Sequence, residues 1–248
     1  LGVVALVALS AGGCVPSPAT TQAQSMAGLW QVFLWAGAAV AALVWILATW
    51  ALLRYRRRPD PLPKQDRGNL PIEIAWTAAP LITVLVLFVL TLQSLAAVDG
   101  TDAAAGSGAP GSAAAESGAA ASDAIRLDVT AYRWGWTFTF PDAGVTVSSE
   151  PGSVPQIDLP VGTTVHVTLA SLDVDHAFYV PAFLFKRDAI PGRLTTFDLR
   201  VVAPGVYGGL CAEYCGVFHD AMPFEIQGVS MGDYQAWLAS RRAGSAAP

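Results

Sequence analysis

The stretch "IRLDVTAYRWGWTFTF", residues 125–140, decides the fold of the C-terminal half of the chain. Apolar and polar side chains alternate along it, and it is rich in threonine and aromatic residues, as is typical of β-strands with one buried face. The same pattern returns in "TVHVTLAS" (164–171), "TTFDLRVV" (195–202) and "PFEIQGVS" (223–230), with glycine and proline between them. We therefore predict an all-β sandwich or barrel over residues 124–242. A closing helix is expected from about Met231 to Arg242, followed by a tail over 243–248.

Upstream of this domain the chain is strongly apolar. The run 29–53 has 25 residues without a charge, and 74–92 has 19 more. As a helix the first run would be about 37 Å long, enough for a hydrocarbon core of about 30 Å. The overall composition agrees, with 53% hydrophobic and 13% charged residues and a mean hydropathy of +0.46. We predict a transmembrane helical hairpin, with spans at 29–53 and 72–98.

The predicted loop between the spans, residues 54–71, is basic. It contains six Lys or Arg residues and two Asp residues, a net charge of +4. Basic loops next to short spans stay in the cytoplasm. Both ends of the chain are therefore expected outside the membrane. A segment rich in alanine, glycine and serine at 99–123 has no large side chains to bury and predicts a flexible linker.

The first residues show a different apolar pattern. Residues 1–13 form a segment too short to span a membrane, followed at once by Cys14. A hydrophobic core, small residues and then cysteine resemble a bacterial lipoprotein signal, which would make Cys14 an acylated residue of an extracytoplasmic segment, 14–28. An ordinary signal or a free buried cysteine are the alternatives. The segment lacks a basic n-region, and Ala11 stands where such signals usually carry leucine.

The stretch "CAEYCGVFHDAMPF", residues 211–224, concentrates soft metal ligands in one loop. In an oxidising compartment two cysteines favour a disulfide, but a disulfide does not call for His219 and Met222. Zinc prefers closed Cys and His sets at other spacings, whereas thiolates, imidazoles and a thioether together suit copper. A second imidazole must come from His166 or His176. His166 alternates within a strand pattern, while His176 lies where a strand end meets a proline turn.

Together, "DVDHAFYVPAFLFKRDAIPGRL" and "CAEYCGVFHDAMP" resemble subunit II of the haem-copper cytochrome c oxidases. The resemblance extends from about residue 29 to 240. It implies a cupredoxin-like Greek-key domain on the extracytoplasmic side of a bacterial plasma membrane, with a binuclear copper centre, CuA. It also implies the ligands. Cys211 and Cys215 would be the bridging thiolates, and His176 and His219 the terminal imidazoles. Met222 would supply the thioether and Glu213 a backbone carbonyl.

The resemblance implies further roles and partners. Trp134 would be the aromatic residue through which the electron enters, although a strand aromatic in the core is the alternative. The Glu213 side chain would reach a magnesium or manganese ion shared with subunit I. Glu73 would stand at the mouth of a proton pathway, or act as an interfacial anchor. Gly135 stands between two tryptophans where many relatives have a larger residue.

The implied activity is the transfer of electrons from cytochrome c, through CuA, to the haem centres of subunit I. Three histidines and no CxxCH motif mean that oxygen reduction requires another polypeptide. The expected partners are subunit I, subunit III and a cytochrome c donor. Nucleic acid is not expected to bind. Residues 99–248 carry 16 acidic and 8 basic residues. This surface is either simply solvated or steers a basic donor.

Three other functions are alternatives. A membrane-tethered cupredoxin for copper storage or delivery would use fewer and more exposed ligands. Nitrous oxide reductase has a similar copper motif but is soluble and has a large additional domain. Quinol oxidase subunit II shares the hairpin and the sandwich but lacks the copper ligands.

Overall fold

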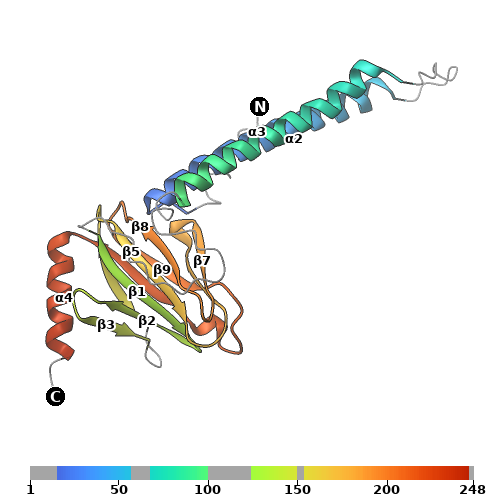
Figure 1. The fold of residues 1–248 in the computed structure, drawn as a ribbon. Helices are drawn as coiled ribbons and strands as arrows, with labels where there is room; N and C mark the ends of the chain where they lie inside the picture. The colour runs from blue at the N-terminus through green and yellow to red at the C-terminus, as the bar shows by residue number, and fades with distance from the viewer. Residues whose placement is uncertain (1–15, 57–67, 100–123, 150–153, 246–248) are drawn as a thin grey trace. The chain divides into compact units, whose positions relative to one another are not determined.

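The computed structural model describes residues 16–56, 68–99, 124–149 and 154–245, and the chain divides into two units (Figure 1). One unit is Gly28–Leu95, and the other combines Leu1–Ala27 with Ala96–Pro248. The predicted signal segment 1–13, Cys14, most of the basic loop, nearly all of the linker and the last three residues lie outside the described residues.

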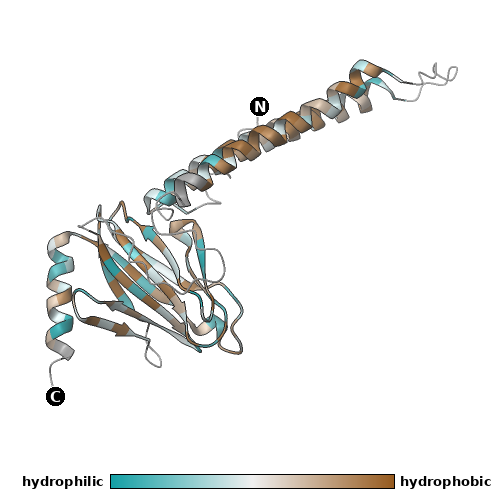
Figure 2. Cartoon of the chain, in the orientation of Figure 1, coloured by the Kyte–Doolittle hydropathy of each residue, from teal (hydrophilic) through white to brown (hydrophobic). Residues whose placement is uncertain are grey.

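The helical unit contains most of two long helices, α2 (Thr21–Arg54) and α3 (Leu70–Asp99). Both are long and apolar enough to cross a membrane, and Figure 2 shows that hydrophobic residues predominate along them. Helix α2 begins at Thr21 rather than at Leu29, because the backbone N–H of Ala23 donates to Thr20 Oγ1 (3.1 Å), a side-chain cap among polar residues. Helix α3 is capped in the same way by Asn69, which accepts a hydrogen bond from the Ile72 backbone (3.4 Å).

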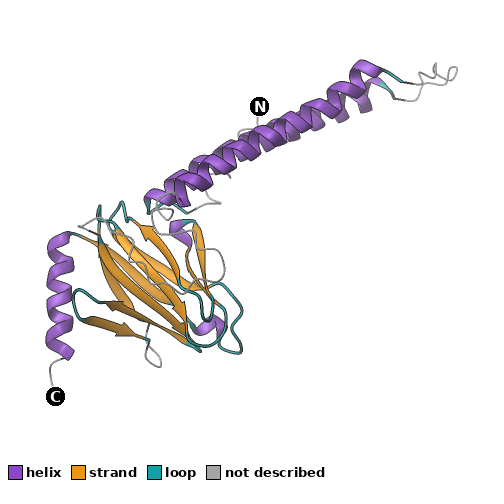
Figure 3. Cartoon of the chain, in the orientation of Figure 1, coloured by secondary structure: helices purple, strands orange, loops and turns teal. Residues whose placement is uncertain are grey.

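The other unit is a β-sandwich of two five-stranded sheets (Figure 3). One sheet has the order β3-β2-β1-β5-β8 and the other β4-β10-β9-β6-β7. The strands are β1 (Ile125–Tyr132), β2 (Gly135–Phe140), β3 (Val145–Ser148), β4 (Gln156–Pro160), β5 (Val165–Ser171), β6 (His176–Val180), β7 (Phe185–Ala189), β8 (Thr195–Leu199), β9 (Gly205–Cys211) and β10 (Phe224–Val229). Two 3₁₀ turns, η1 (Pro181–Phe183) and η2 (His219–Ala221), and a final helix, α4 (Met231–Ser245), complete the unit. The predicted fold class, a helical hairpin plus a β-sandwich, is confirmed.

The core follows the alternation in the sequence. On β1 the side chains of Leu127, Val129 and Ala131 are fully buried, and their polar neighbours face outward. Aromatic side chains fill the space between the sheets, and Phe178 of β6 stacks on Phe224 of β10 with ring centroids 4.9 Å apart. Such a core holds the ends of β6 and β9 rigidly.

A short segment before α2 belongs to the β-sandwich unit. The Ala19 backbone donates to Ala182 O (2.9 Å) and accepts from the Val202 backbone (2.9 Å), while Thr20 and Ala23 are fully buried. The predicted domain, starting at residue 124, omitted this segment. A contact across more than 150 positions leaves no trace in local periodicity.

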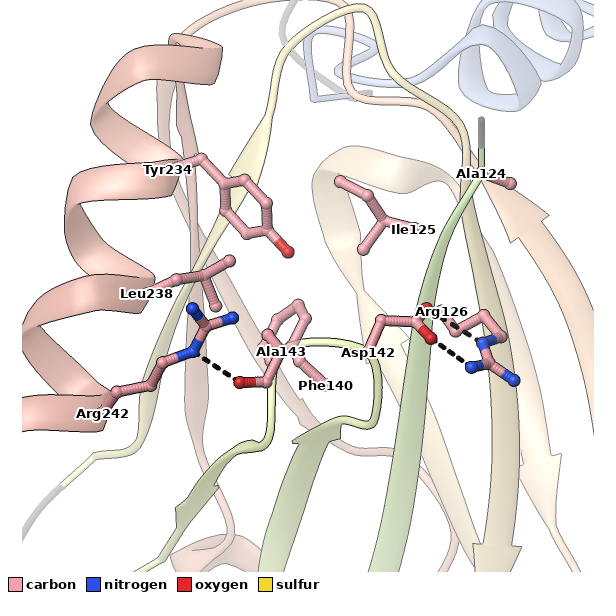
Figure 4. A pocket seen from close by; sticks show the side chains of 9 residues that line it. All are labelled: Ala124, Ile125, Arg126, Phe140, Asp142, Ala143, Tyr234, Leu238 and Arg242. Carbon is pink, nitrogen blue, oxygen red and sulfur yellow. Dashed lines mark hydrogen bonds and ion pairs between the residues drawn. The ribbon is translucent and has the colours of Figure 1, made fainter. Parts of the chain in front are cut away.

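A shallow pocket of about 240 Å³ lies beside α4, at the start of β1 and the end of β2. Figure 4 shows Arg126 paired with Asp142 on one side, and Arg242 Nε donating to Ala143 O (2.6 Å) on the other. The Arg242 contact attaches α4 to the sandwich. The pocket lies at the opposite end of β1 from Trp134, the residue expected near the metal site.

Candidate metal centre

The predicted ligands converge at one end of the second sheet. His176 is the first residue of β6, and Cys211 is the last residue of β9. These two strands are antiparallel neighbours, with Phe178 opposite Cys211. The loop after β9 then supplies Cys215, and η2 and the residue following it supply His219 and Met222. Sheet order therefore brings His176 close to Cys211, 35 residues further along the chain.

The donor atoms form two groups around the two sulfurs. Cys211 Sγ lies 3.8 Å from His176 Nδ1 and 3.2 Å from the carbonyl oxygen of Glu213. Cys215 Sγ lies 3.6 Å from His219 Nδ1 and 3.5 Å from Met222 Sδ. The ligand atoms of His176, Cys211 and Cys215 all lie within 4.8 Å of one another, so this group could hold a metal ion.

Both cysteines are free thiols, so they do not form the disulfide that was the simpler expectation. They are buried, as are His176 and Met222. Burial, followed by the neighbouring Cys211, raises the pKa of the Cys215 thiol to about 11. Without a metal this thiol therefore stays protonated at neutral pH, and a bound cation would be needed to hold it as a thiolate.

Asp173 orients the His176 ring. Asp173 Oδ1 lies 2.9 Å from His176 Nε2, which leaves Nδ1 facing Cys211. The same carboxylate accepts hydrogen bonds from the backbone N–H groups of Val174 (2.7 Å) and Arg133 (2.8 Å) and from Arg133 Nε (3.2 Å). Burial alone would raise the pKa of the Asp173 carboxyl, but these hydrogen bonds hold it well below its usual value. The sequence analysis did not find this role, although an aspartate three residues before a candidate ligand is a usable signal.

Trp136 holds the other side of the site. Its indole Nε1–H donates to the carbonyl of Met222 (3.0 Å), and its ring contacts those of His176 and Phe224. Trp136 is fully buried. This buried tryptophan therefore links the methionine end of the ligand loop to the aromatic core, a link that the strand pattern could not reveal.

Trp134 lies outside the core, in the turn between β1 and β2, with 36% of its surface exposed. The core position considered as an alternative belongs to Trp136 instead. The Trp134 ring packs on Gly216, the residue after Cys215, where a Cβ atom would lie 3.1 Å from Trp134 Cζ2. Gly135 also has no room for a side chain, because a Cβ there would lie 2.8 Å from Ser149 Cβ.

The side chains of the remaining candidate residues have other partners. The Glu213 carboxylate is paired with Lys186 Nζ (3.0 Å), which also contacts Asp188. Glu73 Oε1 accepts a hydrogen bond from the Asn69 backbone (3.2 Å) at the start of α3. His166 lies on β5, with Nδ1 2.7 Å from Asp198 Oδ1 on the neighbouring strand β8. His166 is thus a strand residue outside the ligand group.

Comparisons with known proteins identify two matching segments. Residues 154–229 match the family model described as "Cytochrome C oxidase subunit II, periplasmic domain". Residues 8–97 match the corresponding transmembrane-domain model.

Whole-chain relatives agree with these segments. A probable cytochrome c oxidase subunit 2 of Streptomyces avermitilis is 34% identical over 94% of this chain and 83% of the relative. A cytochrome c oxidase subunit 2 of Cereibacter sphaeroides is 27% identical over 92% of this chain and 79% of the relative. Among solved structures, the periplasmic domain of cytochrome oxidase subunit II of Bradyrhizobium japonicum is 28% identical. It covers 49% of this chain and 96% of its own, with a TM-score of 0.45.

Proposed function

The chain belongs to the cytochrome c oxidase subunit II family, and from that premise we propose that it accepts electrons from cytochrome c at a binuclear copper centre and passes them to the haem centres of subunit I. As a subunit II it is a component of an oxidoreductase complex. Oxygen reduction is assigned to subunit I, because this sequence has no haem-binding motif and has too few histidines for a haem-copper centre.

One observation carries the two-copper proposal: the donor atoms are divided between the two cysteines. His176 and the Glu213 carbonyl lie beside Cys211, while His219 and Met222 lie beside Cys215. Six donors exceed the four of a tetrahedral structural zinc site. Two cysteines shared between two ions would give each ion both sulfurs, one imidazole and one weak ligand.

The donor set fits copper. Thiolates and a thioether are soft ligands that select copper, and imidazole suits it equally. When bound, a pair of coppers held by the two cysteines would supply a one-electron carrier. We assign Cys211 and Cys215 as bridging ligands, His176 and His219 as terminal imidazoles, Met222 as the thioether and Glu213 as the carbonyl ligand.

The chain's own residues keep such a site rigid and dry. The strands β6 and β9 anchor two ligands at their ends, and the core behind them is closely packed. Asp173 fixes the orientation of His176, and Trp136 tethers the Met222 backbone. Burial of both cysteines keeps water away from the sulfurs.

The membrane assignment combines the two apolar helices with the matched transmembrane-domain model. We propose that α2 and α3 both span a bacterial plasma membrane. The basic loop would then lie in the cytoplasm and the sandwich on the extracytoplasmic side, where a soluble or tethered cytochrome c could reach it. Subunit I is the proposed acceptor, and subunit III a further proposed partner.

The resemblance implies roles for two carboxylates. A magnesium or manganese ion shared with subunit I would use Glu213, but this carboxylate is ion-paired with Lys186, so this chain alone does not fit such an ion. Any such ion would need ligands from subunit I. Glu73 is exposed at the start of α3, where it caps the helix backbone. Its place at the mouth of a proton pathway is proposed on the resemblance.

Copper storage or delivery is not favoured. The family matches cover both the hairpin and the ligand domain, and the sulfurs are buried. The test is a metal count and an EPR spectrum of the purified oxidase complex. Two coppers in this subunit, with one unpaired electron shared between them, are expected, and Cys215→Ser should abolish that signal. One copper, or zinc alone, would refute the proposal.

A further inference from the structure

The ligand loop carries a second exposed aromatic residue beside Trp134. The Phe218 ring meets the Trp134 ring edge to face, with centroids 5.1 Å apart and an interplanar angle of 86°. Phe218 is 54% exposed and immediately precedes the ligand His219. We call Trp134 and Phe218 the aromatic patch, and we propose that Phe218 is a residue that recognises the electron donor, through an apolar surface around the donor's redox group.

The position of the aromatic patch relative to the sulfurs supports this role. Cys211 and Cys215 are almost fully buried, so a donor protein cannot touch them. Trp134 packs on Gly216, next to Cys215, and Phe218 precedes His219. The patch therefore covers the loop between two predicted ligands. Because electron transfer weakens steeply with distance, a donor gains by docking directly on it.

Two further exposed residues of the ligand loop carry no charge. Tyr214 and Val217 on the same loop are 76% and 79% exposed. Arg133, the residue before Trp134, is joined to Asp173 by an ion pair of 3.2 Å within the chain itself. Exposed apolar clusters of this kind mark interaction sites, and the centres of protein interfaces are enriched in aromatic residues and depleted of charge. The partner that fits is a redox protein with a matching apolar, uncharged surface.

This inference rests on the proposed function and adds a prediction about salt. Apolar contacts are not screened by ions, whereas interactions between exposed charges fade beyond about 8 Å at physiological ionic strength. About half of the Phe218 surface remains to be buried by a partner. The hydrophobic gain for that area corresponds to about fivefold in affinity.

The experiment measures the second-order rate of oxidation of a reduced soluble cytochrome c by the purified oxidase complex at low and high ionic strength. Phe218→Ala should lower this rate about fivefold at both. Phe218→Leu keeps an apolar side chain and should stay near the wild-type rate. Val206→Ala is the matched control, because Val206 is also exposed (59%) but lies near the start of β9, away from Cys211.

Two further measurements separate docking from damage to the metal site. The copper count and EPR signal should be unchanged in both Phe218 variants, and a small-molecule reductant should reduce the site at the wild-type rate. An unchanged rate in Phe218→Ala with intact coppers would overturn the inference alone, as would a loss confined to low ionic strength. Absence of two coppers from the wild-type complex would instead overturn the proposed function, and the inference with it.

Discussion

Replacing Asp173 tests whether a carboxylate outside the ligand set holds the site together. Each Asp173 oxygen has two donors: Oδ1 accepts from His176 Nε2 and the Val174 backbone, and Oδ2 accepts from the backbone and the Nε of Arg133. Asp173→Ala removes all four interactions and frees the His176 ring. Loss of such a partner to a metal-ligating histidine typically costs about 10- to 100-fold in metal affinity.

Asp173→Asn should have a smaller effect, because the amide keeps one oxygen. Its NH₂ group must face either the donors on His176 and Val174 or those on Arg133, so one pair of hydrogen bonds is lost in either orientation. The assay is a copper titration against a competing chelator, followed by absorption and EPR. Asp175→Asn is the control, since Asp175 is an exposed acid of the same loop and the charge change is identical.

The result that would refute this reasoning is an Asp173→Ala protein with wild-type copper affinity and an unaltered EPR spectrum. If Asp173 acted only as a surface charge for a basic donor, Asp173→Asn and Asp175→Asn would change the salt dependence of donor oxidation equally and leave the copper untouched. The structure argues against that view, because the Asp173 carboxylate is already engaged inside the domain.

Three further predictions concern stability. Ala23→Asp should destabilise the β-sandwich by more than about 2 kcal/mol in chemical unfolding, because it places a charge at a fully buried position. The control Ser25→Asp, at an exposed position, should leave the free energy of unfolding unchanged. Gly216→Ala should lower the free energy of unfolding by about 1–3 kcal/mol and displace Trp134, because φ is +121° there and a Cβ would lie 3.1 Å from the indole. Chemical unfolding would measure the first effect, and exposure of Trp134 to a fluorescence quencher the second. Burial raises the pKa of Asp158 from 3.8, so its contribution to stability is largest when it is protonated and is lost as pH rises through its folded pKa. Asp158→Asn should therefore remove part of the fall in unfolding free energy above about pH 4, and identical pH profiles would contradict this.

Much of the fold was predictable because it depends on local patterns. The alternation in residues 125–140 predicted a strand whose buried face is now seen in Leu127, Val129 and Ala131. Uncharged runs predicted two helices, although their beginnings at Thr21 and Leu70 depended on polar caps that the apolar pattern does not contain. The boundary of the β-sandwich unit was less predictable, because its N-terminal segment is joined by a contact between Gln22 and Asp198, 176 positions apart.

The sequence by itself determined the two long apolar helices, the alternating strands and the close spacing of Cys211, Cys215, His219 and Met222 in one short stretch. Its local pattern favoured His176 over His166 as the further imidazole, and the resemblance to a family implied the same residue.

Tertiary structure decided the rest, because spacing along a chain specifies neighbours within one loop but not which strands become adjacent. The pairing of β6 with β9 brings His176 to Cys211, Asp173 selects the ring nitrogen that faces the sulfur, and the β1–β2 turn leaves Trp134 at the surface while Trp136 enters the core. These arrangements depend on sheet order and on side-chain packing between distant segments, which no local period records.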